Sequence, residues 1–246
     1  MTDYALYVES GPRRRKTMVH VLDLLGCIAQ GPTTEEAIEA TPDAIRGYLR
    51  FLRKHGEASA GPEAAFATAV AQHVMEGPFL GNGDPAPGFP PDFQPLTADE
   101  MKVFLPRLSW LHADLLDVTR GLTHAQLVAE PAAGRTISGI LDHVAGAEYA
   151  YLQTPLSKPE GMSKVLRAVR EGPDLLAALT IMWQMVEGRM AGAIAEERTQ
   201  TVQHGQVAWT ARRAMRRLLE HGWEHLLEIS RRLEGAARWP DRPESD

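Results

Sequence analysis

The sequence predicts an α+β fold class, a small β-β-β-α-β domain followed by an all-α four-helix bundle. Apolar and polar residues alternate near the N-terminus, as in half-buried strands. The segment 77–95 is packed with glycine and proline, which resist both helix and central strand. After it, apolar residues recur at the helical period. The chain of 246 residues exceeds one average domain. We therefore expect domains at 1–76 and 96–238, a linker at 77–95 and a polar tail at 239–246.

The composition argues against several classes of protein. The formal net charge is −6, and nucleic acid is not the expected partner because phosphate backbones bind a broad basic face. The N-terminus has no basic start followed by an apolar run, and no stretch is long and apolar enough for a membrane helix. A lone cysteine, Cys27, excludes an internal disulfide and fits a reducing compartment. We expect a cytoplasmic protein with no membrane partner.

The first 76 residues predict three strands, a helix and a closing strand. Two apolar runs, at 4–8 and 18–25, flank a turn and indicate a hairpin. The basic cluster 13–16 at its tip is interpreted as a solvated turn rather than a ligand site. A short strand at 27–30 precedes a threonine-capped helix that runs to Lys54, with a kink or break at Pro42. The stretch 65–75 is expected to close the sheet.

This order, with the phrase LGCIAQG at 25–31 and TEEA at 34–37, resembles the HicB-like antitoxin domain over residues 1–76. Members of that family commonly add a DNA-binding helix-turn-helix or ribbon module after this domain. None follows here, which argues against binding to an operator.

The second half predicts four helices. A capping box at 97–100 starts the first, in which Pro106 should cause a kink or a later start. The others are expected at about 138–152, 173–197 and 210–234. Four helices joined by loops pack as a bundle.

Three histidines in this half have the pattern of a metal site. His221 and His225 stand one helical turn apart and can point the same way, and His143 lies beside apolar residues on the second helix. Three neutral imidazoles suit zinc or nickel and leave a coordination position open. From the spacing alone, ordinary surface or core histidines are the better interpretation, because such a pair is common.

The stretch ISGILDHVAGAE at 137–148 resembles the DinB / YfiT-like metalloprotein superfamily. That superfamily has one histidine on the second helix and a His-x-x-x-His pair on the last, and the resemblance extends over residues 96–235. It implies that His143, His221 and His225 bind a divalent metal. The family's common tryptophan before the second helix is replaced by Arg135 and Thr136, which puts the substrate pocket in doubt.

Neighbouring carboxylates could support the metal ligands. Glu228 follows His225 by three residues and could orient it. Glu148 is a candidate for a hydrogen bond that supports a ligand or for a structural hydrogen bond, rather than for a metal ligand. No catalytic residue can be named. Met182, Trp183 and Met185 are expected to fill the core. The other histidines are expected to have ordinary polar roles; they are His20, His55, His73, His112, His124 and His204.

Two functions remain open on the sequence. The resemblance implies a metal-dependent enzyme, either a transferase of a low-molecular-weight thiol to an electrophilic small molecule or a hydrolase. The alternative is a non-catalytic binding or regulatory protein that senses a metal or small ligand. Both families often form dimers, so a homodimer is expected. The sequence names neither the metal, the thiol nor the electrophile.

Overall fold

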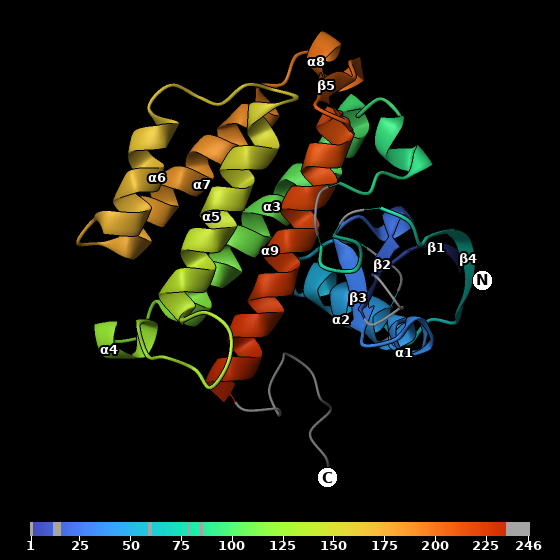
Figure 1. Cartoon of the computed structure of the whole chain (residues 1–246), viewed down its shortest axis with the longest axis horizontal. Helices are drawn as coiled ribbons and strands as arrows, with labels where there is room; N and C mark the ends of the chain where they lie inside the picture. The colour runs from blue at the N-terminus through green and yellow to red at the C-terminus, as the bar shows by residue number, and fades with distance from the viewer. Residues whose placement is uncertain (1, 12–15, 59–60, 78, 84–85, 235–246) are drawn as a thin grey trace.

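The computed structural model describes residues 2–11, 16–58, 61–77, 79–83 and 86–234 (Figure 1). The expected polar tail, and residues 13–15 of the basic cluster, lie outside the described residues. The mixed α+β class is confirmed, with a sheet in the N-terminal half and helices in the C-terminal half.

The N-terminal half contains a four-stranded sheet in the order β3-β2-β1-β4. Its strands are β1 (Thr2–Ser10), β2 (Thr17–Val21), β3 (Cys27–Gly31) and β4 (Phe66–Val74). The first three pair antiparallel through short connections, whereas β4 runs parallel to β1 because two helices intervene. The second run of the expected hairpin is shorter than predicted, since a 3-10 turn, η2 (Leu22–Leu24), follows β2. The specific HicB-like resemblance stays a prediction.

The expected helix is divided at Pro42 into α1 (Thr34–Glu39) and α2 (Thr41–Lys54). The Thr33 hydroxyl accepts a hydrogen bond from the backbone N–H of Glu36 and caps α1. Pro42 lies in the first turn of α2, where its missing N–H needs no partner. The two helices therefore follow from one proline within an otherwise continuous apolar pattern.

The C-terminal half is built around α3 (Ala98–Thr119), α5 (Ile137–Gln153), α7 (Leu175–Ala191) and α9 (Ala211–Glu234). In this bundle α3 and α5 each pack against both α7 and α9. Pro106 lies inside α3 and does not delay its start, which the capping box of Thr97 and Glu100 fixes.

The third helix, predicted at about 173–197, is shorter in the structure, where it is α7. It ends at Ala191, before the poor helix former Gly192, and α8 (Ala195–Thr199) starts anew. The Glu197 carboxylate accepts a hydrogen bond from the backbone N–H of Ile194 at that new start. The sequence interpretation also missed four short elements, which are α4 (His124–Leu127), α6 (Met162–Glu171), β5 (Val202–His204) and β6 (Val207–Trp209).

The segment expected to be a spacer packs closely against α9. Within it, η3 (Pro90–Phe93) follows Phe89, whose side chain is fully buried, and the Asp92 side chain is also buried. By contrast, Phe79 is exposed. Whether this segment separates two independently folding domains stays a prediction.

Helix α9 joins the two halves, because it contacts β3 as well as α3 and α5 (Figure 1). The rings of Tyr48 and Phe51 from α2 each lie 5.1 Å from that of Trp223 on α9. The apolar core is accordingly continuous from the sheet into the bundle. Among the described residues, no helix has the length and apolar character needed to cross a membrane.

Candidate metal centre

Three histidine side chains converge where α5 faces α9. The Nε2 atom of His221 lies 3.1 Å from Nε2 of His143 and 3.1 Å from Nε2 of His225. Because His221 and His225 are four residues apart, both project from the same side of α9 toward α5. One candidate ligand atom from each residue lies within 4.8 Å of the other two.

The spacing of these nitrogens fits a tetrahedral metal ion. Ligand nitrogens about 2.0–2.1 Å from such an ion stand roughly 3.3 Å apart, close to the 3.1 Å separations observed. The Nδ1–H of His225 donates to the Glu228 carboxylate at 2.8 Å, which leaves Nε2 of a neutral His225 with its lone pair facing the other histidines. A cation at this point would satisfy lone pairs that otherwise repel one another.

Electrostatics favour the neutral, ligating form of His143 and His221. Burial, followed by the charge of His225, lowers the pKa of His143 to about 4. The same two causes lower the pKa of His221 well below its ordinary value. Neutral imidazole is the form that binds a metal, so His143 and His221 can bind one near neutral pH without first losing a proton.

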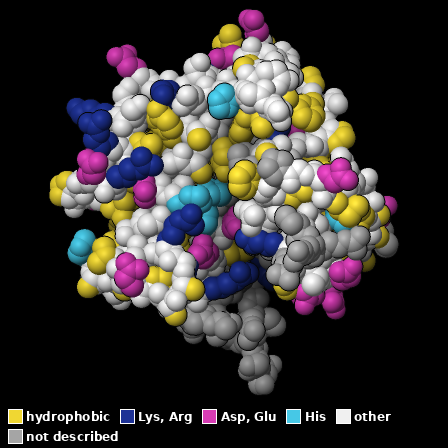
Figure 2. Space-filling view, viewed as in Figure 1, with side chains coloured by type: hydrophobic (Ala, Val, Ile, Leu, Met, Phe, Trp, Pro, Cys, Tyr) yellow, Lys and Arg dark blue, Asp and Glu magenta, His cyan; other side chains and the backbone are white. Residues whose placement is uncertain are grey.

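The histidines border a cavity of about 600 Å³ to which both halves of the chain contribute. Figure 2 shows histidine side chains at the surface of a hollow between the two halves, with basic side chains on its rim. The bundle supplies the three histidines and one wall, while the N-terminal hairpin and the segment after β4 supply the other. The lining comprises Lys16, Phe79, Asn82, Gly83, Arg135, His143, Ala147, Tyr151, His221, Glu224, His225 and Glu228.

In this lining the carboxylates have hydrogen-bond partners, whereas two of the cations have none among the described residues. Glu228 accepts hydrogen bonds from His225 and Arg232, and Glu224 accepts one from the Gln30 amide. The side chains of Lys16 and Arg135 are exposed and make no hydrogen bond or ion pair to any described residue. Because Gln30 is neutral, Glu224 keeps its negative charge, and the two unpaired cations outnumber it before a metal is counted.

Of the two predicted supporting carboxylates, the structure brings only Glu228 to the histidines. Glu148 is fully buried, and its carboxylate lies 3.1 Å from Nε2 of His112 rather than near His143. Glu148 thus makes a structural hydrogen bond, since the five-residue offset rotates it around α5 toward α3. A metal-supporting role for Glu228 remains a proposal.

Sequence reasoning missed the environment of two buried histidines. His112 is held between Glu148 and Glu187, with Nδ1 2.6 Å from the latter, and its ring stacks on Trp183. His20 lies 2.9 Å from the carboxylate of Glu220. Their partners are distant in sequence, so no local spacing could have revealed them.

The remaining histidines have ordinary polar roles, as expected. His55 Nε2 lies 3.1 Å from the Asp114 carboxylate, and His73 Nε2 lies 2.7 Å from the Ser10 hydroxyl. His124 and His204 are exposed. Met182 and Trp183 are buried in the bundle and Met185 packs partly buried against it, which agrees with their predicted role as core residues.

Comparison with known proteins gives little beyond this geometry. No protein-family model matches the chain, and no curated protein matches it. Among solved structures, the chain is similar to YfiT from Bacillus subtilis, described as "a probable metal-dependent hydrolase with an unusual four-helix bundle topology". The likeness has a TM-score of 0.42 and 17% sequence identity, and it covers 56% of this chain and 90% of YfiT. At this TM-score the candidate centre stands on its own geometry.

Proposed function

We propose that this chain is a divalent-metal-dependent enzyme that acts on a small molecule, with His143, His221 and His225 as metal ligands. The observation that carries the proposal is the convergence of the three Nε2 atoms at the edge of an open cavity. A site of three protein ligands keeps a position free, which distinguishes catalytic from closed structural zinc sites. Zinc and nickel are the metals that the nitrogen donors suit best.

A divalent ion bound here would supply a nucleophile at neutral pH by lowering the pKa of a coordinated thiol or water. The protein's own groups orient the ligands and attract the substrate. Glu228 fixes the ring orientation and proton position of His225. Lys16 and Arg135 attract an anionic substrate into the cavity from opposite halves of the chain. The cavity volume of about 600 Å³ is in the range of small-molecule sites.

The finer proposal is transfer of a low-molecular-weight thiol to an electrophilic substrate. The positive charge of the lining supports it, because a thiolate is favoured where unpaired cations line a site. Hydrolysis uses the same centre with water as the nucleophile. In either reaction, the N-terminal half contributes a wall of the site, which gives a reason for the two halves to share one chain.

The alternative function is a non-catalytic sensor of a metal or small ligand, which must be distinguished from an enzyme. The open cavity beside the histidines favours an enzyme, because a structural site normally closes with a fourth ligand. Among the described residues, no further histidine, cysteine, aspartate or glutamate joins the three-histidine group.

The first test is elemental analysis of protein purified without a metal-affinity tag. The wild type should contain near-stoichiometric zinc or nickel, and the His221→Ala, His225→Ala double variant should not. His204→Ala, at an exposed position in β5, is the matched control and should retain the metal. A wild type that stays metal-free after incubation with zinc and with nickel contradicts the proposal.

The metal-loaded protein is then assayed to decide which class of reaction it catalyses. Loss of free thiol from cysteine or glutathione in the presence of 1-chloro-2,4-dinitrobenzene would support thiol transfer. Release of nitrophenol from 4-nitrophenyl acetate without thiol would support hydrolysis. Metal bound without turnover in a broad substrate screen would favour the sensor.

A further inference from the structure

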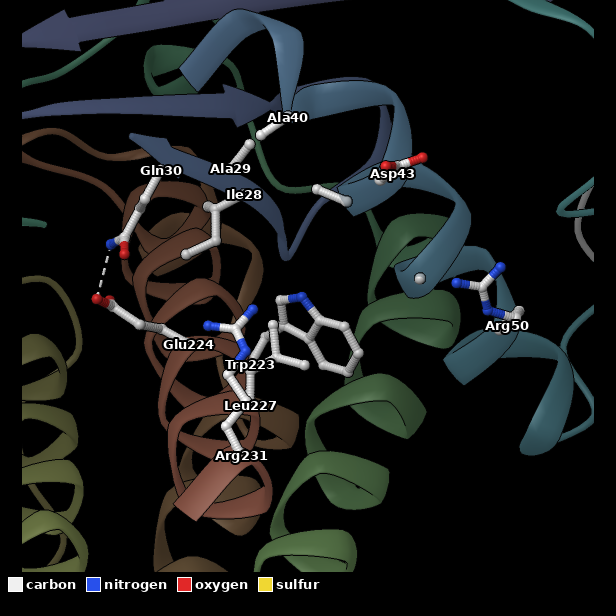
Figure 3. A pocket seen from close by; sticks show the side chains of 12 residues that line it. Ile28, Ala29, Gln30, Ala40, Asp43, Arg50, Trp223, Glu224, Leu227 and Arg231 are labelled. Carbon is white, nitrogen blue, oxygen red and sulfur yellow. Dashed lines mark hydrogen bonds between the residues drawn. The ribbon is translucent and has the colours of Figure 1, made fainter. Parts of the chain in front are cut away.

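A second cavity, of about 330 Å³, lies between the sheet and the bundle (Figure 3). Its walls come from β3, α2, α9 and Ala40, which lies between α1 and α2, and of its lining only Glu224 also borders the metal-site cavity. The lining residues are Ile28, Ala29, Gln30, Ala40, Asp43, Ala44, Gly47, Arg50, Trp223, Glu224, Leu227 and Arg231. This volume is at the small end of the range for ligand pockets, about 300–1,000 Å³.

One side of this cavity is apolar and has room left by a glycine. Ile28, Trp223 and Leu227 supply apolar surface from β3 and α9. Gly47 lies in the middle of α2, and a Cβ built on it meets no atom within 4 Å. Glycine inside a helix is less stable than alanine, and close packing does not require it here. The position instead keeps space open in the cavity that Trp223 also lines.

Two arginines line this cavity and have no acidic partner among the described residues, and of the two Arg50 is half-buried whereas Arg231 is exposed. Figure 3 shows Arg50 from α2 and Arg231 from α9 reaching toward the region of Trp223 from opposite sides. Neither side chain makes a hydrogen bond or ion pair to a described residue, and the Nε of Arg50 is buried with no hydrogen-bond partner. A buried guanidinium N–H without an acceptor is unfavourable, so an anion placed there would be stabilised.

The acidic groups of the lining do not neutralise these arginines. The Glu224 carboxylate accepts a hydrogen bond from Gln30 at 2.7 Å, as the dashed line in Figure 3 shows. Asp43 points to solvent, with a side chain that is 93% exposed, and its ion pair is with Arg46. Glu224 keeps its negative charge because Gln30 is neutral, but neither it nor Asp43 forms an ion pair with Arg50.

We propose that this cavity is a second ligand site, distinct from the metal centre, for a small organic anion with a flat apolar body. The carboxylate binds the half-buried guanidinium of Arg50, which can donate two parallel hydrogen bonds to it. The apolar body lies against Trp223 and Leu227 in the space beside Gly47. The cavity volume limits that body to one or two rings. The proposal does not depend on the metal-dependent activity.

The test uses naphthalene-2-carboxylate and its neutral isostere naphthalene-2-carboxamide as probes, with binding to the full chain measured by isothermal titration calorimetry. The carboxylate should bind wild type at least about tenfold more tightly than the amide. Arg50→Gln should weaken binding of the carboxylate by about tenfold or more and leave the amide unchanged. Arg53→Gln, an exposed position one turn along α2, is the matched control and should bind as wild type does.

Gly47→Leu tests the position of the apolar body, because the new side chain would fill the open space. It should abolish binding of both probes while thermal unfolding stays cooperative; if that variant does not fold, the smaller Gly47→Ala replaces it. Equal binding of the two probes, an unchanged Arg50→Gln variant, or no binding to wild type overturns the proposal. Binding that is lost in His221→Ala but kept in Gly47→Leu also overturns it, because the probe would then occupy the metal-site cavity.

Discussion

The guanidinium of Arg216 binds both carboxylate oxygens of Asp92, with Nε 2.7 Å from Oδ1 and Nη2 3.0 Å from Oδ2. Both side chains are 1% exposed, and the pair joins α9 to the Gly/Pro-rich segment. Arg216 also donates to Glu220, which lies 2.9 Å from His20 on β2. A buried ionic network thus holds the sheet, the connecting segment and the bundle together.

Asp92→Asn should lower the free energy of unfolding by about 3–5 kcal/mol, because it leaves a buried guanidinium without its carboxylate. Urea denaturation followed by circular dichroism measures the change. Asp99→Asn removes a carboxylate that is 89% exposed and should change stability by no more than about 0.5 kcal/mol. Equal stabilities of the two variants would show that the Arg216–Asp92 pair contributes little.

His112 should make stability depend on pH in the alkaline range. Burial alone would lower its pKa, but Glu148 and Glu187 outweigh that effect and raise the pKa to about 9. A raised folded-state pKa gives a contribution that is complete below pH 6.5 and is lost as pH rises to about 9. The contribution is on the order of 3 kcal/mol. His112→Gln should therefore be less stable than wild type at pH 6, with a smaller difference at pH 9.5.

The measurement is a series of urea denaturations between pH 6 and pH 9.5 on both proteins. Taking the difference between them removes the effect of other titrating groups, including His20, whose pKa is also raised. His124→Gln, at an exposed position, should parallel wild type throughout. A wild-type minus His112→Gln difference that is constant with pH would mean that His112 does not bind its proton more tightly in the folded state.

Gly26→Ala should destabilise the fold by about 2 kcal/mol or more, because two constraints act on one position. The residue has a φ of +107°, and a Cβ there would lie 2.1 Å from the Tyr48 hydroxyl. That hydroxyl donates a hydrogen bond to the backbone carbonyl of Leu25. Gly121→Ala is the control, since a Cβ at Gly121 meets nothing within 4 Å. Thermal unfolding compares the two, and similar melting temperatures would contradict the expectation.

The sequence predicted features whose signals are local. The helical spacing of His221 and His225 made a shared ligand face possible, but the resemblance at 137–148 was needed to prefer a metal site. The break at Pro42 follows from the missing N–H. The long-range partners were not predictable in this way. Asp92 and Arg216 are separated by 124 residues, and a Gly/Pro-rich segment has no periodicity that places a carboxylate opposite α9.

Short elements were missed for a different reason. Helix α6 buries Met162, Leu166 and Val169, which have the spacing of one helix face, but ten residues give too few turns for a clear period. The partner of Glu148, His112, could not be named because the rotation of α5 relative to α3 is not specified by the sequence. Burial of a charged residue at a helix interface is set by packing, which single-sequence patterns do not specify.

Glu228→Gln should weaken metal binding by about 10–100-fold without removing a ligand. The Glu228 carboxylate accepts the Nδ1–H of His225 at 2.8 Å and an additional hydrogen bond from Arg232, so it holds the imidazole in one orientation and makes Nε2 a better donor. The amide keeps the size of the side chain and loses the charge. Zinc affinity is measured by competition with a chromophoric chelator at constant pH.

The control for this prediction is Glu160→Gln, an exposed carboxylate in the loop before α6, which changes net charge by the same amount. Its zinc affinity should equal that of wild type. If both variants weaken binding equally, the effect is one of overall charge rather than of the His225–Glu228 hydrogen bond. If neither does, the orientation of His225 is fixed by packing on α9 alone, and Glu228 has no part in the metal site.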